Sequence, residues 1–173
     1  AVGRCGRRRT GVLRLAAEKA GWGEPLEAGH GRGVAVQEVF GSFLATVVEL
    51  QVSDLDRHYY ASHNLTLAQH PSETEARLMV RVLAFALHAE ERLAFGGGLS
   101  TDDEPDLWRR DYTGDIEQWI ELGQPEEARI RRACGRSREV VVVTYSGRSA
   151  GVWWERNGAA LSRQAKLRVI DID

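Results

Sequence analysis

The fold of this chain is decided by the stretch from Asp102 to Gln124, which reads DDEPDLWRRDYTGDIEQWIELGQ. This stretch predicts a β-hairpin, because residues 112–115 (YTGD) are of the small and polar kinds that turns favour and strand-like segments flank them. The expected arms are Asp106–Asp111 and Ile116–Leu122. The sequence therefore predicts two antiparallel strands in the middle part of the chain.

The register of this hairpin brings two acids together. If Asp111 faces Ile116, then Asp106 lies directly across from Glu121. Cross-strand partners are roughly 5 Å apart on one face of a sheet, and like charges there destabilise it unless another group neutralises them. Two interpretations stay open: a divalent cation binds between Asp106 and Glu121, or both acids are solvated on an exposed face.

Length and charge limit the classes of protein to consider. The chain has 173 residues, of which 43% are hydrophobic, and this predicts one globular domain. The formal net charge is only -2, and residues 1–33 hold seven Arg or Lys against three Glu, which leaves sixteen bases and 22 acids in the remainder. A body of that charge repels a phosphate backbone unless a metal or a local arginine patch intervenes.

The sequence lacks the residue spacings that mark zinc sites, redox motifs and phosphate-binding loops. The two cysteines, Cys5 and Cys134, form no metal-ligand or redox motif, and the five histidines have no zinc-ligand spacing. The glycines at 96–98 are not followed by a phosphate-binding motif. The cysteine usage predicts a reduced, cytoplasmic compartment. No apolar run reaches the length of a membrane span, so we expect no membrane partner.

Residues 1–40 differ in composition from the rest. They include the run Arg7–Arg9 and are rich in glycine, with little hydrophobic periodicity. Although arginine richness with few acids faintly resembles a transit peptide, we interpret this segment as a disordered tail, or translated upstream sequence, outside a folded domain at residues 41–173.

The first part of the expected domain is a hairpin followed by a helix. Residues 43–52 and 57–68 are rich in β-branched and apolar residues and predict a long β-hairpin. A helix is expected from Pro71 to about Glu91, with Ser72 and Glu75 as a capping box. The residues expected to form its buried stripe share helical spacing: Met79, Val82, Leu83 and Ala86.

Another face of that helix carries Glu73, Arg77 and Arg81 at intervals of four residues. Such a row is commonly an exposed set of helix-stabilising ion pairs. The alternative is that Glu73, in the first turn, points at a functional site.

The second part of the domain continues the alternation of strands and helices. A helix is expected at residues 125–136, a strand covered on both faces at Val140–Tyr145, a short helix through Trp153 and Trp154, and a last strand at Lys166–Ile172. With a short strand at residues 93–95, this order predicts a mixed α/β fold, in which helices flank a mixed β-sheet and an N-terminal β-hairpin is added. The tryptophans are expected in the core, with base stacking as the alternative role.

Four separate motifs resemble the YaeQ family: HPSET at residues 70–74, DDEP at 102–105 followed by Trp108, WIELG at 119–123, and VWW at 152–154. Members of that family resemble compact variants of the PD-(D/E)XK nuclease fold, whose order of helix, three strands, helix and strand matches the order expected here. The resemblance covers about residues 41–173. Because the family continues with a further helix and strand, the resemblance implies a domain that lacks its C-terminal end.

The resemblance implies a metal site. In nucleases of this fold two carboxylates hold Mg²⁺ or Mn²⁺, which activates a water and stabilises charge on the scissile phosphate. Carried over by position, Asp106 and Glu121 are the metal ligands, and Glu73 is the helix carboxylate that completes a catalytic site. Asp103 or Glu104 is the substitute ligand if Asp106 is not used.

The lysine of the nuclease motif has no counterpart here, because its position falls on Gly123. The adjacent Gln124 is the candidate to orient a water, whereas arginine stays protonated and cannot act as a base. The empty position favours a nucleic-acid-associated protein with a degenerate site. The retained carboxylates favour the alternative, an active Mg²⁺-dependent phosphodiesterase or nuclease acting on DNA or RNA.

The latter half of the second expected helix is marked by the densest basic group of the domain, which comprises Arg129, Arg131, Arg132, Arg136 and Arg138. Nucleic acid is expected to contact Arg131, Arg132 and Arg136 of this group. The alternative is a solvated helix face.

Overall fold

The computed structural model describes residues 14–15, 18, 37–39, 42–44, 47–67, 69–70, 72–97 and 103–172. Most of the predicted tail, residues 1–40, lies outside these ranges, as do Cys5, Pro71 and Asp102. The chain divides into two units, residues 1–72 and 73–173.

The first unit contains two antiparallel strand pairs. The shorter pair is β1 (Gln37–Val39) with β2 (Ser42–Leu44), and the longer is β3 (Val47–Asp54) with β4 (Tyr59–Thr66). The long hairpin predicted from the sequence is therefore confirmed, although its first arm was wrongly predicted as one continuous strand, since β2 and β3 are separate.

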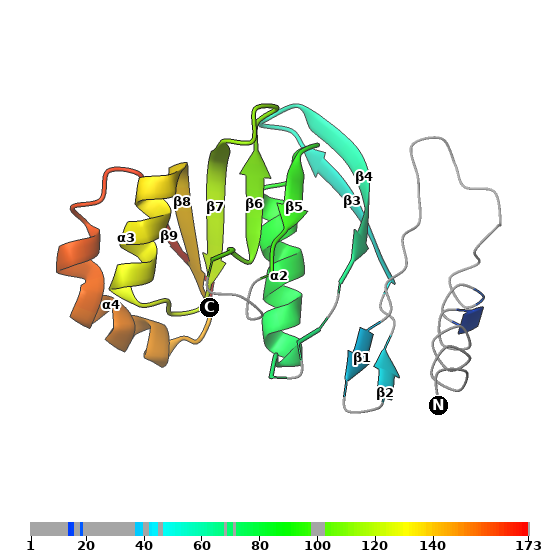
Figure 1. Cartoon of the computed structure of the whole chain (residues 1–173), viewed down its shortest axis with the longest axis horizontal. Helices are drawn as coiled ribbons and strands as arrows, with labels where there is room; N and C mark the ends of the chain where they lie inside the picture. The colour runs from blue at the N-terminus through cyan, green and yellow to red at the C-terminus, as the bar shows by residue number, and fades with distance from the viewer. Residues whose placement is uncertain are drawn as a thin grey trace. The chain divides into compact units, whose positions relative to one another are not determined.

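The second unit is built around a five-stranded sheet with the order β5-β6-β7-β8-β9 (Figure 1). The strands are β5 (Leu93–Phe95), β6 (Leu107–Arg110), β7 (Ile116–Leu122), β8 (Ser137–Thr144) and β9 (Leu167–Asp171). The pairs β5–β6 and β6–β7 are antiparallel, whereas β7–β8 and β8–β9 are parallel. The predicted mixed α/β class with a mixed sheet is confirmed.

Helices flank this sheet. They are α2 (Glu75–Leu87), α3 (Glu127–Arg136) and α4 (Arg148–Leu161). In Figure 1, α2 lies at the β5–β7 side of the sheet, while α3 and α4 lie together at the β8–β9 side. The parallel strands are joined through helices, because a chain that re-enters a sheet in the same direction needs a long connection.

The predicted register of the central hairpin is confirmed along most of its length. Leu107 pairs with Ile120 and Trp108 with Trp119, as expected, and the backbone N–H of Asp106 continues the ladder by donating to the Ile120 carbonyl at 3.1 Å. The register shifts after Arg109, so that Arg110 rather than Asp111 faces Ile116. A β-bulge of this kind adds one residue to one arm, and periodicity alone does not reveal it.

The start and orientation of α2 differ from the expectation. Thr74 caps the helix by accepting from the Arg77 N–H at 3.2 Å, whereas the Ser72 hydroxyl bonds to His70 Nδ1. Met79 is 64% exposed, while Arg81 and Phe85 are buried. The predicted apolar stripe was wrong because the helix presents its arginine row, not Met79, to the interior.

The core of the second unit forms between β7, β8, α3 and α4. It includes Trp119, Ile130, Val140 and Trp153. The valines at positions 140–143 are all fully buried, as predicted for a strand covered on both faces. This core holds β7 rigidly, and β7 carries Glu121.

Candidate functional site

Glu73 directly precedes Thr74, the N-cap of α2, and its carboxylate is buried. One oxygen accepts from Arg77 Nη1 at 3.1 Å and the other from Arg81 Nη1 at 2.9 Å. Glu73 and Arg77 therefore form the i,i+4 ion pair that their spacing predicts, and Arg81 pairs with Glu73 as well, but both pairs lie in the interior rather than on an exposed face.

Asp106 lies one residue before β6 and is 1% exposed. Arg77 Nη2 donates to both of its carboxylate oxygens, at 2.8 and 2.9 Å, and the Leu122 N–H donates to Oδ2 at 2.8 Å. Arg77 thus bridges the two predicted site carboxylates, Glu73 and Asp106. A guanidinium with its planar fork of donors is suited to this role.

Glu121 lies in β7 and is 3% exposed. Its Oε1 accepts from Trp119 Nε1 at 2.7 Å and from Arg129 Nε at 2.8 Å. Burial raises the pKa of the Glu121 carboxyl, the two hydrogen bonds oppose that rise, and the negative charge of Asp106 adds to it. The structure therefore brings Glu121 and Asp106 within electrostatic range, as the register predicted.

Sequence reasoning did not assign Arg129 to this cluster, and it also missed Tyr145, which follows β8. Burial raises the pKa of its hydroxyl, Arg77 lowers it, and Asp106 and Glu73 raise it further. The only signal in the sequence was its place at the end of the apolar run Val140–Tyr145. Parallel strands end at the same edge of a sheet, so the residue after β8 comes close to the residue after β7.

Gly123, at the position of the missing lysine, has φ of +91°. A Cβ built there would lie 3.8 Å from Tyr145 Cε1, which is an ordinary contact. The backbone, rather than a lack of space, is what favours glycine at this position.

The Gln124 side chain bonds to α4 and not to the carboxylate cluster. Its side chain forms two hydrogen bonds with Ser149, from Nε2 to Oγ at 2.6 Å and from Oγ to Oε1 at 3.0 Å. Ser149 belongs to the first turn of α4. Gln124 therefore joins the end of β7 to α4, and its predicted role in orienting a water stays a prediction.

The substitute ligands also have other partners. Glu104 Oε2 accepts from the Gly97 N–H at 2.7 Å, and Asp103 lies 3.5 Å from Arg136 in an exposed ion pair. Arg129 Nη2 donates to the Glu104 carbonyl at 2.8 Å.

A metal at Asp106 and Glu121 stays a prediction. In this arrangement guanidinium groups already neutralise both carboxylates, so Mg²⁺ fits between them only if Arg77 or Arg129 moves. Within the described ranges, no three or more His, Cys, Asp or Glu side chains gather as a group that could hold a metal ion. The cluster as it stands is an arginine–carboxylate network.

The predicted nucleic-acid face on α3 is exposed to solvent. Arg131 lies 3.4 Å from Glu127, and Arg136 pairs with Asp103. Arg132 is exposed and has no ion pair among the residues that the structure describes. Arg129, from the same basic group, turns inward to Glu121 instead.

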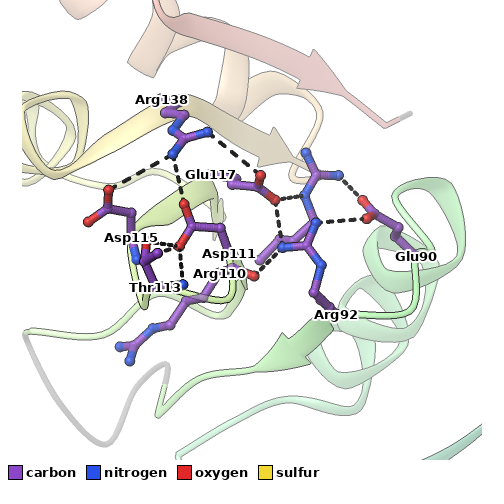
Figure 2. Close-up of polar contacts among 9 residues, drawn as sticks. Glu90, Arg92, Arg110, Asp111, Thr113, Asp115, Glu117 and Arg138 are labelled. Atoms are coloured by element: carbon purple, nitrogen blue, oxygen red, sulfur yellow. Dashed lines mark hydrogen bonds and ion pairs between the residues drawn. The ribbon is translucent and has the colours of Figure 1, made fainter.

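A second charged cluster lies at the tip of the central hairpin (Figure 2). Arg138 lies 2.7 Å from Asp111, 3.9 Å from Asp115 and 3.7 Å from Glu117. Asp111 Oδ1 also accepts from the N–H groups of Thr113 and Asp115, and these bonds shape the turn. Because Arg138 forms ion pairs with all three acids, we interpret the cluster as a structural one that stabilises the hairpin turn.

The fold and the buried network define a class of mixed α/β protein in which arginines bind three buried carboxylates, those of Glu73, Asp106 and Glu121. The family model described as "YaeQ protein" matches residues 44–173, and the chain belongs to the YaeQ family. The resemblance carried by the four sequence motifs is confirmed.

Relatives and solved structures agree with this assignment. "Uncharacterized protein YaeQ" of Escherichia coli (strain K12) is 47% identical over 125 residues, which cover 72% of this chain and 68% of that protein. The corresponding Salmonella typhi protein is 45% identical, with the same coverage. The crystal structure of YaeQ protein from Xanthomonas axonopodis pv. citri has a TM-score of 0.70 and 64% identity, covering 73% of this chain and 72% of that one. The crystal structure of YaeQ protein from Pseudomonas syringae has a TM-score of 0.68 and 38% identity, covering 71% of this chain and 68% of that one.

Among the helices within the described residues, none is long and apolar enough to cross a bilayer.

Proposed function

We propose that this protein is a cytoplasmic, nucleic-acid-associated protein with a degenerate PD-(D/E)XK-type site. The observation that carries the proposal is the bridge from Arg77 to both Glu73 and Asp106. In a metal-dependent nuclease a divalent cation neutralises the carboxylates and activates the water. A guanidinium neutralises them but cannot activate a water, because it neither binds water as a Lewis acid nor gives up its proton.

The missing lysine supports the same conclusion. Gly123 offers no side chain, and its positive φ makes that position unsuited to one. The Lys166 ammonium donates to the Cys134 and Ser137 carbonyls at the end of α3, so it does not take the place of the missing lysine beside Glu121. A general base typically contributes about 10²–10⁴-fold to a rate, and Lys166, the only lysine within the described ranges, is not placed to supply it.

The binding face in this proposal is the exposed side of α3. Arg131, Arg132 and Arg136 contribute three cations that face solvent. Phosphate contacts of this kind carry no sequence information, so we expect binding that depends on salt more than on sequence.

The test is binding of labelled single- and double-stranded oligonucleotides, measured by fluorescence anisotropy in EDTA and in Mg²⁺. We expect metal-independent binding with no cleavage, weakened in Arg131→Ala/Arg132→Ala/Arg136→Ala. The matched control removes three exposed arginines from other places, Arg57→Ala/Arg163→Ala/Arg168→Ala. Equal affinities of wild type and both variants would reject this face.

A second candidate function is Mg²⁺-dependent phosphodiester hydrolysis, favoured by the burial of Glu73, Asp106 and Glu121 together. It requires that Arg77 leave Asp106 when metal and substrate bind. Incubation of the same oligonucleotides with Mg²⁺ or Mn²⁺ decides between the two functions. Cleavage that Glu121→Gln abolishes, while exposed Glu155→Gln leaves it intact, would replace the binding proposal with this one.

A further inference from the structure

A groove with a basic lining runs along one face of α4, outside the arginine–carboxylate cluster. It has a volume of about 680 Å³. Its lining includes Arg148 and Arg156 of α4 and, beside them, Gln124 and Ser146. None of the described residues that line it is acidic, although the sequence as a whole has a net negative charge.

The two arginines of this groove have their donors available. Neither Arg148 nor Arg156 forms an ion pair or a side-chain hydrogen bond with any residue that the structure describes, and neither guanidinium is buried. This sets them apart from Arg77, Arg81 and Arg129, which carboxylates hold. Two unpaired guanidinium groups in a groove whose described lining contains no acid form a site for an anion, although the exposed Glu155 precedes Arg156 on α4 outside that lining.

Other polar side chains of the lining are held in place by hydrogen bonds within the protein. Asn157 directs its amide N–H to the Trp153 carbonyl, and Gln124 and Ser149 bond to each other, so these side chains are held in place. Trp153 is held by a bond from its indole N–H to the Pro125 carbonyl. These hydrogen bonds fix the part of the lining that surrounds the two arginines, so the groove is already formed without a ligand.

The spacing of the arginines indicates the size of the ligand. Arg148 and Arg156 are eight residues apart on one helix, which corresponds to a rise of about 12 Å. That rise is wider than one phosphate group. The pair therefore suits a ligand that carries several phosphates in succession.

We propose that the α4 groove binds a chain of phosphate groups through Arg148 and Arg156. Such a chain occurs in a single strand of nucleic acid and in a free polyphosphate, and both present the same anionic oxygens to the guanidinium groups. The inference goes beyond the proposed function, because it concerns α4 rather than the arginines of α3.

The experiment uses two probes, a labelled single-stranded oligonucleotide and inorganic tripolyphosphate. Affinity for the first is measured by anisotropy over a salt series, and for the second by calorimetry. For the oligonucleotide we expect Arg148→Ala/Arg156→Ala to weaken binding by about tenfold or more, and to reduce the slope of log K against log salt by about 1.4, since each phosphate contact contributes about 0.7. Arg148→Lys/Arg156→Lys should keep most of the slope.

The control, Arg163→Ala/Arg168→Ala, removes the same charge from exposed positions that do not line the groove. It should bind both probes nearly as wild type does, and thermal melting should show that all variants are folded. Binding of the oligonucleotide alone assigns the groove to nucleic acid, and binding of tripolyphosphate as well assigns it to phosphate chains in general.

The proposal is overturned if Arg148→Ala/Arg156→Ala binds both probes as tightly as wild type, or if wild type binds neither. If Arg148→Ala/Arg156→Ala loses binding and the triple variant of α3 does not, the result supports the groove and rejects the α3 face as the binding site. The reverse pattern removes the groove and leaves the proposed function intact.

Discussion

Arg77 Nη2 donates to both carboxylate oxygens of Asp106, at 2.8 and 2.9 Å, although 29 residues separate the two in the sequence. The Arg77 side chain is 12% exposed and that of Asp106 is 1% exposed. The other Nη atom of Arg77 holds Glu73. Arg77 therefore bridges two buried acids, and Arg81 supplies the second positive charge. Together the two arginines meet the electrostatic need that a metal meets in a nuclease site.

Replacing Arg77 with methionine should destabilise the fold strongly. Removal of one partner leaves the buried Asp106 charge uncompensated, which costs about 3–5 kcal/mol in the free energy of unfolding. Urea denaturation measures the loss. Arg138→Met, in the exposed cluster of Figure 2, is the control and should cost about 1 kcal/mol or less. Similar losses in both variants would contradict the burial argument.

Removal of the same arginine should uncover metal affinity. Without Arg77, Asp106 regains unneutralised carboxylate oxygens, the ligands that Mg²⁺ and Mn²⁺ prefer, while Glu73 loses one ion pair and keeps the other, with Arg81. We expect calorimetry to detect Mn²⁺ binding in folded Arg77→Met and little in wild type. Adding Asp106→Asn to the variant should abolish it. Tight Mn²⁺ binding by wild type would instead support the phosphodiesterase.

The raised pKa of Glu121 makes stability depend on pH. A carboxyl whose pKa is higher in the folded than in the unfolded state binds more protons when folded between the two pKa values, so stability falls as pH rises through that window. The contribution is fully present below the ordinary carboxyl pKa and is lost above the folded pKa. Glu121→Gln should flatten this part of the profile of unfolding free energy against pH. Glu155→Gln, an exposed change of the same kind, should leave it as in wild type.

A side chain at Gly123 should cost stability through the backbone. Because φ is +91°, Gly123→Ala should lose about 1–3 kcal/mol. Gly151→Ala, inside α4 with open space around the added methyl, should instead gain about 0.5–1 kcal/mol. Denaturation of both variants checks the contrast. The outcome also decides whether Gly123→Lys can report on a missing base, since a lysine there carries the same strain.

The sequence by itself determined the hairpin and its register from Leu107 to Arg109, because alternation along a strand and the chemistry of a turn are local properties. It also determined the buried strand at residues 140–143 and, through four short motifs, the family. The register in turn predicted that Asp106 and Glu121 lie near each other. These conclusions depend on neighbours in the sequence or on one strand facing the next.

The tertiary structure alone decided how those acids are neutralised. The row of Glu73, Arg77 and Arg81 was visible in the sequence, but whether it faced water or Asp106 depended on the rotation of α2 against the sheet. Likewise Arg129 belongs to the same helix as the exposed Arg131, and only packing turned it toward Glu121. Helical spacing determines which residues share a face. Which face is buried, and which charge it meets there, depends on groups that are distant in sequence and adjacent in space.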